Sequence, residues 1–235
     1  MIMSTIEQNL QAVRDSIAQA ALEAQRAPED VTLLAVSKTF GADAVLDAMR
    51  AGQMAFGENY LQEALDKIAF VKEAAPQHVP AWHFIGPIQS NKTRPIAEHF
   101  DWVHTVEREK IAARLSEQRP AGLPDLNICL QVNISGEASK SGVTPADLPA
   151  LAHAVALLPR LRLRGLMAIP EPETDVTLQR FAFAQLRTLY EQLKADGLAL
   201  DTLSMGMSAD LRAAVLEGAT IVRVGSAIFG SRNYS

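Results

Sequence analysis

Short apolar runs alternate with amphipathic stretches along almost the whole chain, and this alternation limits the fold more than any other feature. The residues between the runs have helical patterns, at 43–51, 60–75, 107–119, 144–158, 176–196 and 208–218. The runs themselves have the length of buried strands, and eight are found, at 31–36, 54–56, 82–85, 102–104, 128–132, 163–169, 202–205 and 221–224. Repeated βα units of this kind predict an α/β protein with a parallel sheet.

The number of units favours a closed barrel over an open doubly wound sheet, which stays the alternative. A (β/α)8 TIM barrel takes roughly 250 residues, so a chain of 235 residues would be used almost entirely by one barrel. We therefore expect residues 1–235 to form a single domain. Apolar residues also recur at helical spacing over residues 4–26, before the first strand, which predicts an extra N-terminal helix.

Charge and composition exclude several classes of partner. The net charge is −5, so the chain has no long-range attraction for nucleic acids or anionic membranes. The N-terminus lacks a secretory signal, and no apolar stretch reaches the roughly 20 residues that span a bilayer, so we expect a cytoplasmic protein. Cys129, the single cysteine, lies in an apolar run and is expected to be a core thiol.

The first apolar run ends at Ser37-Lys38-Thr39, which would place a lysine at the functional mouth of a barrel. Active sites of β/α barrels lie on the loops after the carboxyl ends of the strands. Since alternate residues share a face of a strand, Lys38 is in register with Leu34 and Val36. On the inner face, a desolvated amine would have a lowered pKa and could attack an aldehyde. The alternative is a lysine that extends from the strand end into solvent.

The last two runs carry features of an anion site. Arg223 lies within the eighth run and needs a partner or a polar mouth, because a buried, uncompensated guanidinium is costly. Gly225 and Ser226 follow directly, at the predicted start of a short helix, where barrels often bind phosphate. Ser208, after the seventh run, could cap the next helix and donate to phosphate. Together with Lys38, these residues describe a site for a phosphorylated aldehyde.

Ordered motifs over nearly the whole length resemble one family. They are Val36-Ser37-Lys38, Phe56-Gly57-Glu58-Asn59-Tyr60, His83 to Lys92, Val132 to Gly142, Arg164-Gly165-Leu166-Met167, Ser204 to Ser208 and Arg223 to Gly230. The chain resembles the pyridoxal phosphate homeostasis proteins, single-barrel relatives of the alanine racemase N-terminal domain. The resemblance implies pyridoxal 5'-phosphate (PLP) as the cofactor and an alanine racemase N-terminal-domain-like barrel.

The resemblance also implies roles for individual residues. Lys38 is similar to the lysine that forms the internal aldimine, and Arg223 to the residue that faces the pyridine nitrogen. The phosphate contacts would be Ser208, Gly225 and Ser226, and the other cofactor-pocket residues would be Asn59 and Met167. No catalytic residue and no metal ligand is assigned.

A role in storing, carrying or delivering PLP is favoured over catalysis. A permanent cation at the pyridine nitrogen disfavours ring protonation, and an unprotonated ring is a poorer electron sink. The related racemases also use a tyrosine from a separate β domain, and we expect this chain to lack such a domain. The partners would be PLP and the apo-enzymes that receive it, and the family suggests a monomer.

Two enzyme functions are kept as alternatives: an amino-acid racemase or similar PLP enzyme, and a Schiff-base aldolase acting on sugar phosphates. Lys140 could guide the phosphate or form a second aldimine, although a solvated loop lysine is the simpler interpretation. Hydrogen bonding in the core or at the mouth is expected for His83 and His104, and Glu58 is a possible charge partner at the mouth.

Overall fold

The eight predicted strands form a closed parallel barrel in the computed structural model, which describes residues 4–136 and 141–230. Each strand pairs with the next one along the chain, and β8 pairs with β1. Four residue pairs join these two, from Thr32↔Ile221 to Ala35↔Val224. The strands are β1 Thr32–Val36, β2 Ala55–Glu58, β3 Ala81–Phe84, β4 Trp102–Val106, β5 Leu126–Gln131, β6 Leu161–Met167, β7 Thr202–Ser204 and β8 Ile221–Val224. The prediction of a barrel is confirmed, and the open sheet is excluded.

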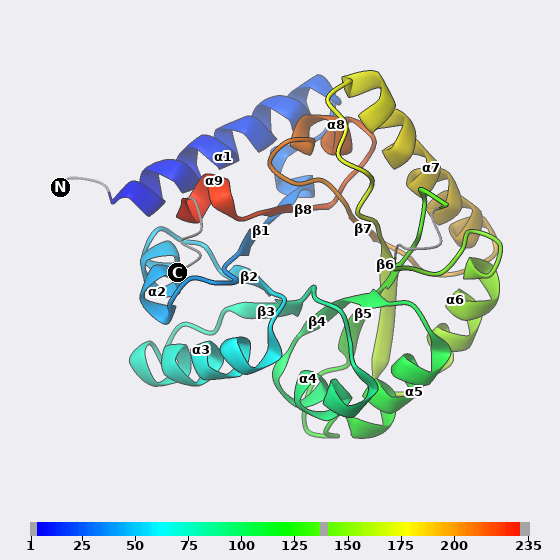
Figure 1. Cartoon of the computed structure of the whole chain (residues 1–235), viewed down its shortest axis with the longest axis horizontal. Coiled ribbons are helices and arrows are strands. Elements are labelled where there is room, and N and C mark those ends of the chain that lie inside the picture. The colour runs from blue at the N-terminus through cyan, green and yellow to red at the C-terminus, as the bar shows by residue number, and fades with distance from the viewer. Residues whose placement is uncertain (1–3, 137–140, 231–235) are drawn as a thin grey trace.

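Helices surround the barrel, and the predicted N-terminal helix α1 (Thr5–Glu23) lies across α8 and α9 (Figure 1). Ser4 caps α1, since its hydroxyl accepts from the amide of Glu7 over 3.1 Å. The remaining helices are α2 Ala42–Arg50, α3 Leu61–Ala74, α4 Thr93–His99, α5 Glu109–Gln118, α6 Leu148–Ala156, α7 Val176–Ala195, α8 Leu211–Leu216 and α9 Ser226–Phe229, with 3₁₀ helices η1 Pro28–Asp30 and η2 Ser90–Lys92.

Helix α4 is absent from the predicted pattern. It has seven residues and contains Pro95, so it offers little helical periodicity to detect. The structure nevertheless buries Ile96 and Ala97 from this helix in the core. Tertiary packing rather than local preference stabilises such a short helix.

Alternate side chains of β1 point to opposite sides of the strand, one set toward the helices and the other toward the inside of the barrel. Leu33 and Ala35 belong to the large apolar cluster between the strands and the helices. Leu34 is equally buried but faces the inside of the barrel, where its side chain lies about 3.1 Å from the place that a Cβ on Gly57 would occupy. Lys38 comes two residues after the end of β1, in a turn, so the turn and not the alternation of the strand sets its position.

Cys129 is fully buried, and burial raises the pKa of its thiol to about 12. The expectation of a core thiol is confirmed. Within the described ranges, no helix is long and apolar enough to cross a membrane, and no group of three or more histidine, cysteine or acidic residues has the arrangement of a metal site.

Candidate functional site

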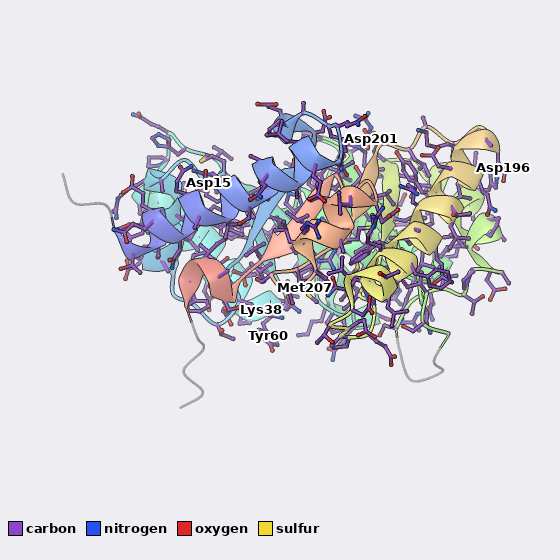
Figure 2. All side chains as sticks on the ribbon, turned by 90° about the horizontal axis from the view of Figure 1, so that it is seen from above. Asp15, Lys38, Tyr60, Asp196, Asp201 and Met207 are labelled. Atoms are coloured by element: carbon purple, nitrogen blue, oxygen red, sulfur yellow. The ribbon has the colours of Figure 1, made fainter. Side chains whose placement is uncertain are left out.

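Lys38 and the Gly225-Ser226 turn lie at the same mouth of the barrel. Lys38 follows the carboxyl end of β1, and Gly225 follows that of β8, its neighbour in the sheet. The strands are so close that a Cβ on Gly225 would lie 3.2 Å from the carbonyl oxygen of Val36. Figure 2 shows Lys38 on the same side of the molecule as Tyr60 and Met207, with Asp201 on the opposite side. The lysine and the glycine turn therefore open toward one region.

The turn that carries Lys38 is attached to helix α3 on both sides of the lysine. Before it, the carbonyl of Ser37 accepts from the Nζ of Lys67 over 2.7 Å. After it, the amide of Thr39 donates to Glu63 over 2.7 Å. Thr39 has a φ of +68°, which is uncommon for a β-branched residue and is held by these contacts. The half-buried Lys38 is thus placed by a rigid turn.

Glu58, at the end of β2, is the buried centre of this attachment. Its Oε1 accepts from the hydroxyl of Ser37 over 2.6 Å and from Lys67 over 2.8 Å. Burial raises the pKa of Glu58, although Lys67 and the Ser37 hydroxyl act in the opposite direction. Its second oxygen is buried, with no partner among the described residues. Glu58 faces α3 and not the barrel interior, so it supports the lysine turn from outside.

Arg223 lies inside the barrel and has the partners that its position demands. It is 4% exposed, and its NH1 group donates to the hydroxyl of Ser204 over 2.8 Å. Its NH2 group donates to the carbonyl of Ala168 over 3.0 Å. Burial lowers the pKa of Arg223 to about 10, so the guanidinium stays charged at neutral pH. A guanidinium has five N–H groups, and within the described residues two of them donate to these partners.

Asn59, directly after β2, is fixed by a close approach of the backbone. A Cβ on Gly86 would lie 2.2 Å from the carbonyl oxygen of Asn59, so only glycine fits at position 86. The side-chain oxygen of Asn59 is buried and has no partner within the part of the chain that is described. Asn59 lines a cavity of about 250 Å³ at the mouth, together with Ile85, Thr105, Glu107, Gln131 and Ile169.

A larger cavity of about 590 Å³ adjoins the first, since Gln131, Ser141 and Ile169 line both. Met207 and Asp210 line its other side. Space for a small molecule is therefore present at the carboxyl-terminal mouth, beside the loops after β5, β6 and β7. Among the described residues, Asn59 lines one of these cavities, whereas Lys38, Arg223 and Gly225 line neither.

The three predicted phosphate contacts come from two neighbouring loops. Gly225 precedes α9, which begins at Ser226, as expected for a short helix after the eighth strand. Ser208 is exposed in the loop after β7 and lines a cavity of about 350 Å³ that lies against helix α1, with Ala227 of α9 and with Ser16 and Glu23 of α1. Its expected capping role is wrong, because the N-cap of α8 is Asp210. Ala209 and Asp210 lie between Ser208 and Leu211, the first residue of α8.

Met167 ends β6 and is buried next to Ser204 in the sheet register. It lies outside the apolar cluster beneath the helices, which is consistent with an inward-facing position near Arg223. Lys140 lies outside the described residues.

The ion pair between Glu63 and Lys67 was not predicted from the sequence. Their spacing of four residues on a helix is a recognisable sign of such a pair. In the structure, the Nζ of Lys67 lies 2.5 Å from the carboxylate oxygen of Glu63.

Comparison with known proteins places the chain in a family. The family described as "Alanine racemase, N-terminal domain" matches residues 7–233. The "Pyridoxal phosphate homeostasis protein" of Pseudomonas aeruginosa is 64% identical over 99% of this chain and 98% of its own length. The structure of PipY from Synechococcus elongatus, solved with PLP bound, is 37% identical, covers 96% of this chain and 100% of that one, and has a TM-score of 0.83.

A more distant similarity concerns the fold alone. The alanine racemase of Corynebacterium glutamicum is 17% identical and has a TM-score of 0.68, with 99% of this chain matching 62% of that one. The barrel described above is therefore the architecture of the alanine racemase N-terminal domain. From its full-length match to the curated relatives, the chain belongs to the pyridoxal phosphate homeostasis protein family.

Proposed function

We propose that this protein holds PLP as a Schiff base on Lys38 and serves to store, carry or deliver the cofactor. The observation that carries the proposal is the placement of Lys38 and Gly225-Ser226 after adjacent strands at one mouth. PLP supplies an aldehyde and a phosphate on one ring, so an amine and an anion site close together match its two ends. The likeness to PipY, whose structure has PLP bound, supports the same assignment.

The residues at the mouth fit such a ligand. The first amides of a helix have no intrahelical acceptor, so Ser226 and Ala227 can donate to phosphate oxygens, and the Ser226 and Ser208 hydroxyls can add to them. Arg223 offers charged donors that suit an unprotonated ring nitrogen. The buried oxygen of Asn59 that has no described partner is a ready acceptor for a ligand N–H or O–H group, and Met167 would pack against the ring.

A storage role is proposed in preference to amino-acid chemistry because of Arg223. A guanidinium keeps its proton, so it disfavours a second proton on the ring nitrogen facing it. The electron-accepting power of the ring is then low. We propose further that residues 1–235 act as one PLP-binding domain, in the cytoplasm and as a monomer, and that PLP passes to apo-enzymes.

The test is to reduce the PLP-loaded protein with borohydride and to map the modified peptide by mass spectrometry. We expect the pyridoxyl group on Lys38, and none after Lys38→Ala. Lys92→Ala is a suitable control, because this exposed lysine lies in η2. A label found on other lysines but not on Lys38 would refute the assignment, and protein that takes up no PLP would favour the aldolase alternative.

The racemase alternative has its own test. Loaded protein incubated with amino acids in deuterated water should show no steady exchange of the α-proton. Exchange that persists in wild type and disappears in Lys38→Ala would replace the storage role by catalysis.

A further inference from the structure

Four polar side chains form a continuous chain of hydrogen bonds through the interior of the barrel. His83 Nδ1 lies 2.9 Å from His104 Nε2, and His104 Nδ1 lies 2.7 Å from the hydroxyl of Ser204. Ser204 in turn accepts from Arg223 over 2.8 Å. The four residues come from β3, β4, β7 and β8, so the series of hydrogen bonds crosses the barrel from one side to the other (Figure 1).

At His83, this series of hydrogen bonds reaches the mouth of the barrel opposite to the proposed PLP site. His83 lines a cavity of about 600 Å³ together with residues at the starts of strands, among them Thr32, Ala55 and Trp102. The His83 ring stacks on that of Trp102, with the ring centroids 5.2 Å apart and the planes 4° from parallel. The position of the imidazole is therefore fixed at this end, as that of Arg223 is at the other.

The direction of the hydrogen bonds follows from the donors available. Arg223 can only donate, so the Ser204 oxygen accepts. Ser204 is fully buried, and its hydroxyl hydrogen has one described acceptor, the Nδ1 atom of His104. His104 then carries its proton on Nε2 and donates to Nδ1 of His83, which carries its own proton on Nε2, beside the cavity. The reverse direction would leave the buried Ser204 hydrogen without an acceptor among the described residues, which costs free energy.

Both histidines stay neutral in this arrangement. Burial lowers the pKa of His83 to about 3 and that of His104 well below its ordinary value, with the charge of Arg223 contributing to the second shift. The two groups that anchor Arg223, the Ser204 hydroxyl and the Ala168 carbonyl, are neutral as well. These two anchors add no negative charge, unlike a hydrogen-bonded carboxylate. The charge of Asp210 does act on Arg223, but among the described residues the hydrogen bonds of Arg223 go to Ser204 and Ala168.

From this geometry we propose that Ser204 and His104 are positioning residues for Arg223. They hold its guanidinium as a charged donor toward the ring nitrogen of PLP and thereby keep that nitrogen unprotonated. The inference rests on the proposed function for the identity of the ligand. The direction of the hydrogen bonds is a property of the protein alone and can be measured without PLP.

The first experiment is long-range ¹H–¹⁵N NMR of the imidazoles in protein freed of PLP. We expect His104 and His83 both to carry a proton on Nε2 and none on Nδ1. A proton on Nδ1 of His104 would overturn the proposed direction. This result does not depend on PLP binding, so a failure of the proposed function and a failure of this inference can be told apart.

The second experiment compares Ser204→Thr with Ser204→Val, two side chains of similar shape that differ in the hydroxyl. We expect the Thr variant to release PLP within twofold of the wild-type rate and the Val variant to release it at least tenfold faster, which corresponds to about 1.4 kcal/mol. With ¹⁵N-labelled PLP, the ring nitrogen should shift toward the protonated form in the Val variant but not in the Thr variant. Equal behaviour of the two variants would refute the positioning role.

Two further variants guard against a general loss of structure. Ser116→Ala removes another buried serine hydroxyl, which donates to the carbonyl of Pro159 outside the barrel interior, and it should leave the ring-nitrogen signal unchanged. If Ser204→Val does not fold, Ser204→Ala takes its place against the same Thr variant. A ring-nitrogen shift in Ser116→Ala as large as in the Ser204 variant would also count against the proposal.

Discussion

The Nζ of Lys67 on α3 lies 2.7 Å from the carbonyl oxygen of Ser37, the residue directly before Lys38. The same ammonium group lies 2.8 Å from Glu58. A helix on the outside of the barrel therefore holds the turn that presents the proposed PLP lysine, through a charge pair that is itself buried.

Loss of this ammonium group should destabilise the protein strongly. We expect Lys67→Met to lower the free energy of unfolding by about 3–5 kcal/mol, because the buried Glu58 carboxylate loses its charged partner. Urea denaturation at neutral pH measures the change. The double variant Lys67→Met/Glu58→Gln should recover part of it. Lys72→Met, at an exposed position of the same helix, should change stability by less than about 0.5 kcal/mol; an equal loss in both single variants would contradict the role of the pair.

The interior histidines should make the protein less stable in acid. Burial holds the pKa of His83 at about 3, against an ordinary value of 6.5. Between these values the unfolded state binds a proton that the folded state does not. The contribution of each such histidine to the free energy of unfolding is therefore fully present above pH 6.5. It declines as the pH falls, by about 1.4 kcal/mol for each pH unit. Unfolding curves over this window should show a smaller slope for His83→Gln, whereas His78→Gln, at an exposed position, should keep the wild-type slope.

A methyl group at position 86 should disturb the mouth. In Gly86→Ala the new Cβ would lie 2.2 Å from the Asn59 carbonyl oxygen, so the backbone must move, at a cost of about 1–3 kcal/mol. Thermal unfolding and PLP affinity should both decrease. Gly122→Ala is the matched control, since a Cβ there meets no atom within 4 Å. Unchanged PLP affinity in Gly86→Ala would remove Asn59 from the proposed site.

The phosphate end of PLP should depend more on backbone amides than on the Ser226 hydroxyl. We expect Ser226→Ala to weaken PLP binding by about fivefold, the effect of one hydrogen bond worth about 1 kcal/mol. Titration with pyridoxal, which lacks the phosphate, should give the same affinity for the variant and for wild type. A similar loss for both ligands would place the effect elsewhere than at the phosphate.

Much of the site could be predicted because its signals are local in the sequence. Lys38 follows an apolar run, and Gly225-Ser226 follows another, so the barrel pattern places all three at the carboxyl-terminal mouth. Arg223 was expected to need a partner, and the structure provides Ser204 and the Ala168 carbonyl. The expected cap at Ser208 is wrong because the chain continues to Asp210 before the helix begins, and the exact start of a helix is weakly encoded.

The sequence by itself determined the order of strands and helices and the strand ends at which the polar residues lie, since hydrophobic periodicity and turn residues are properties of neighbouring positions. Only the tertiary structure decided which of these residues meet. His104 and Ser204 are 100 positions apart and become hydrogen-bonded neighbours, and Glu58 receives its partner from a helix. The reason is that closure of the barrel and the register between strands set such contacts, and no local pattern along the chain records them.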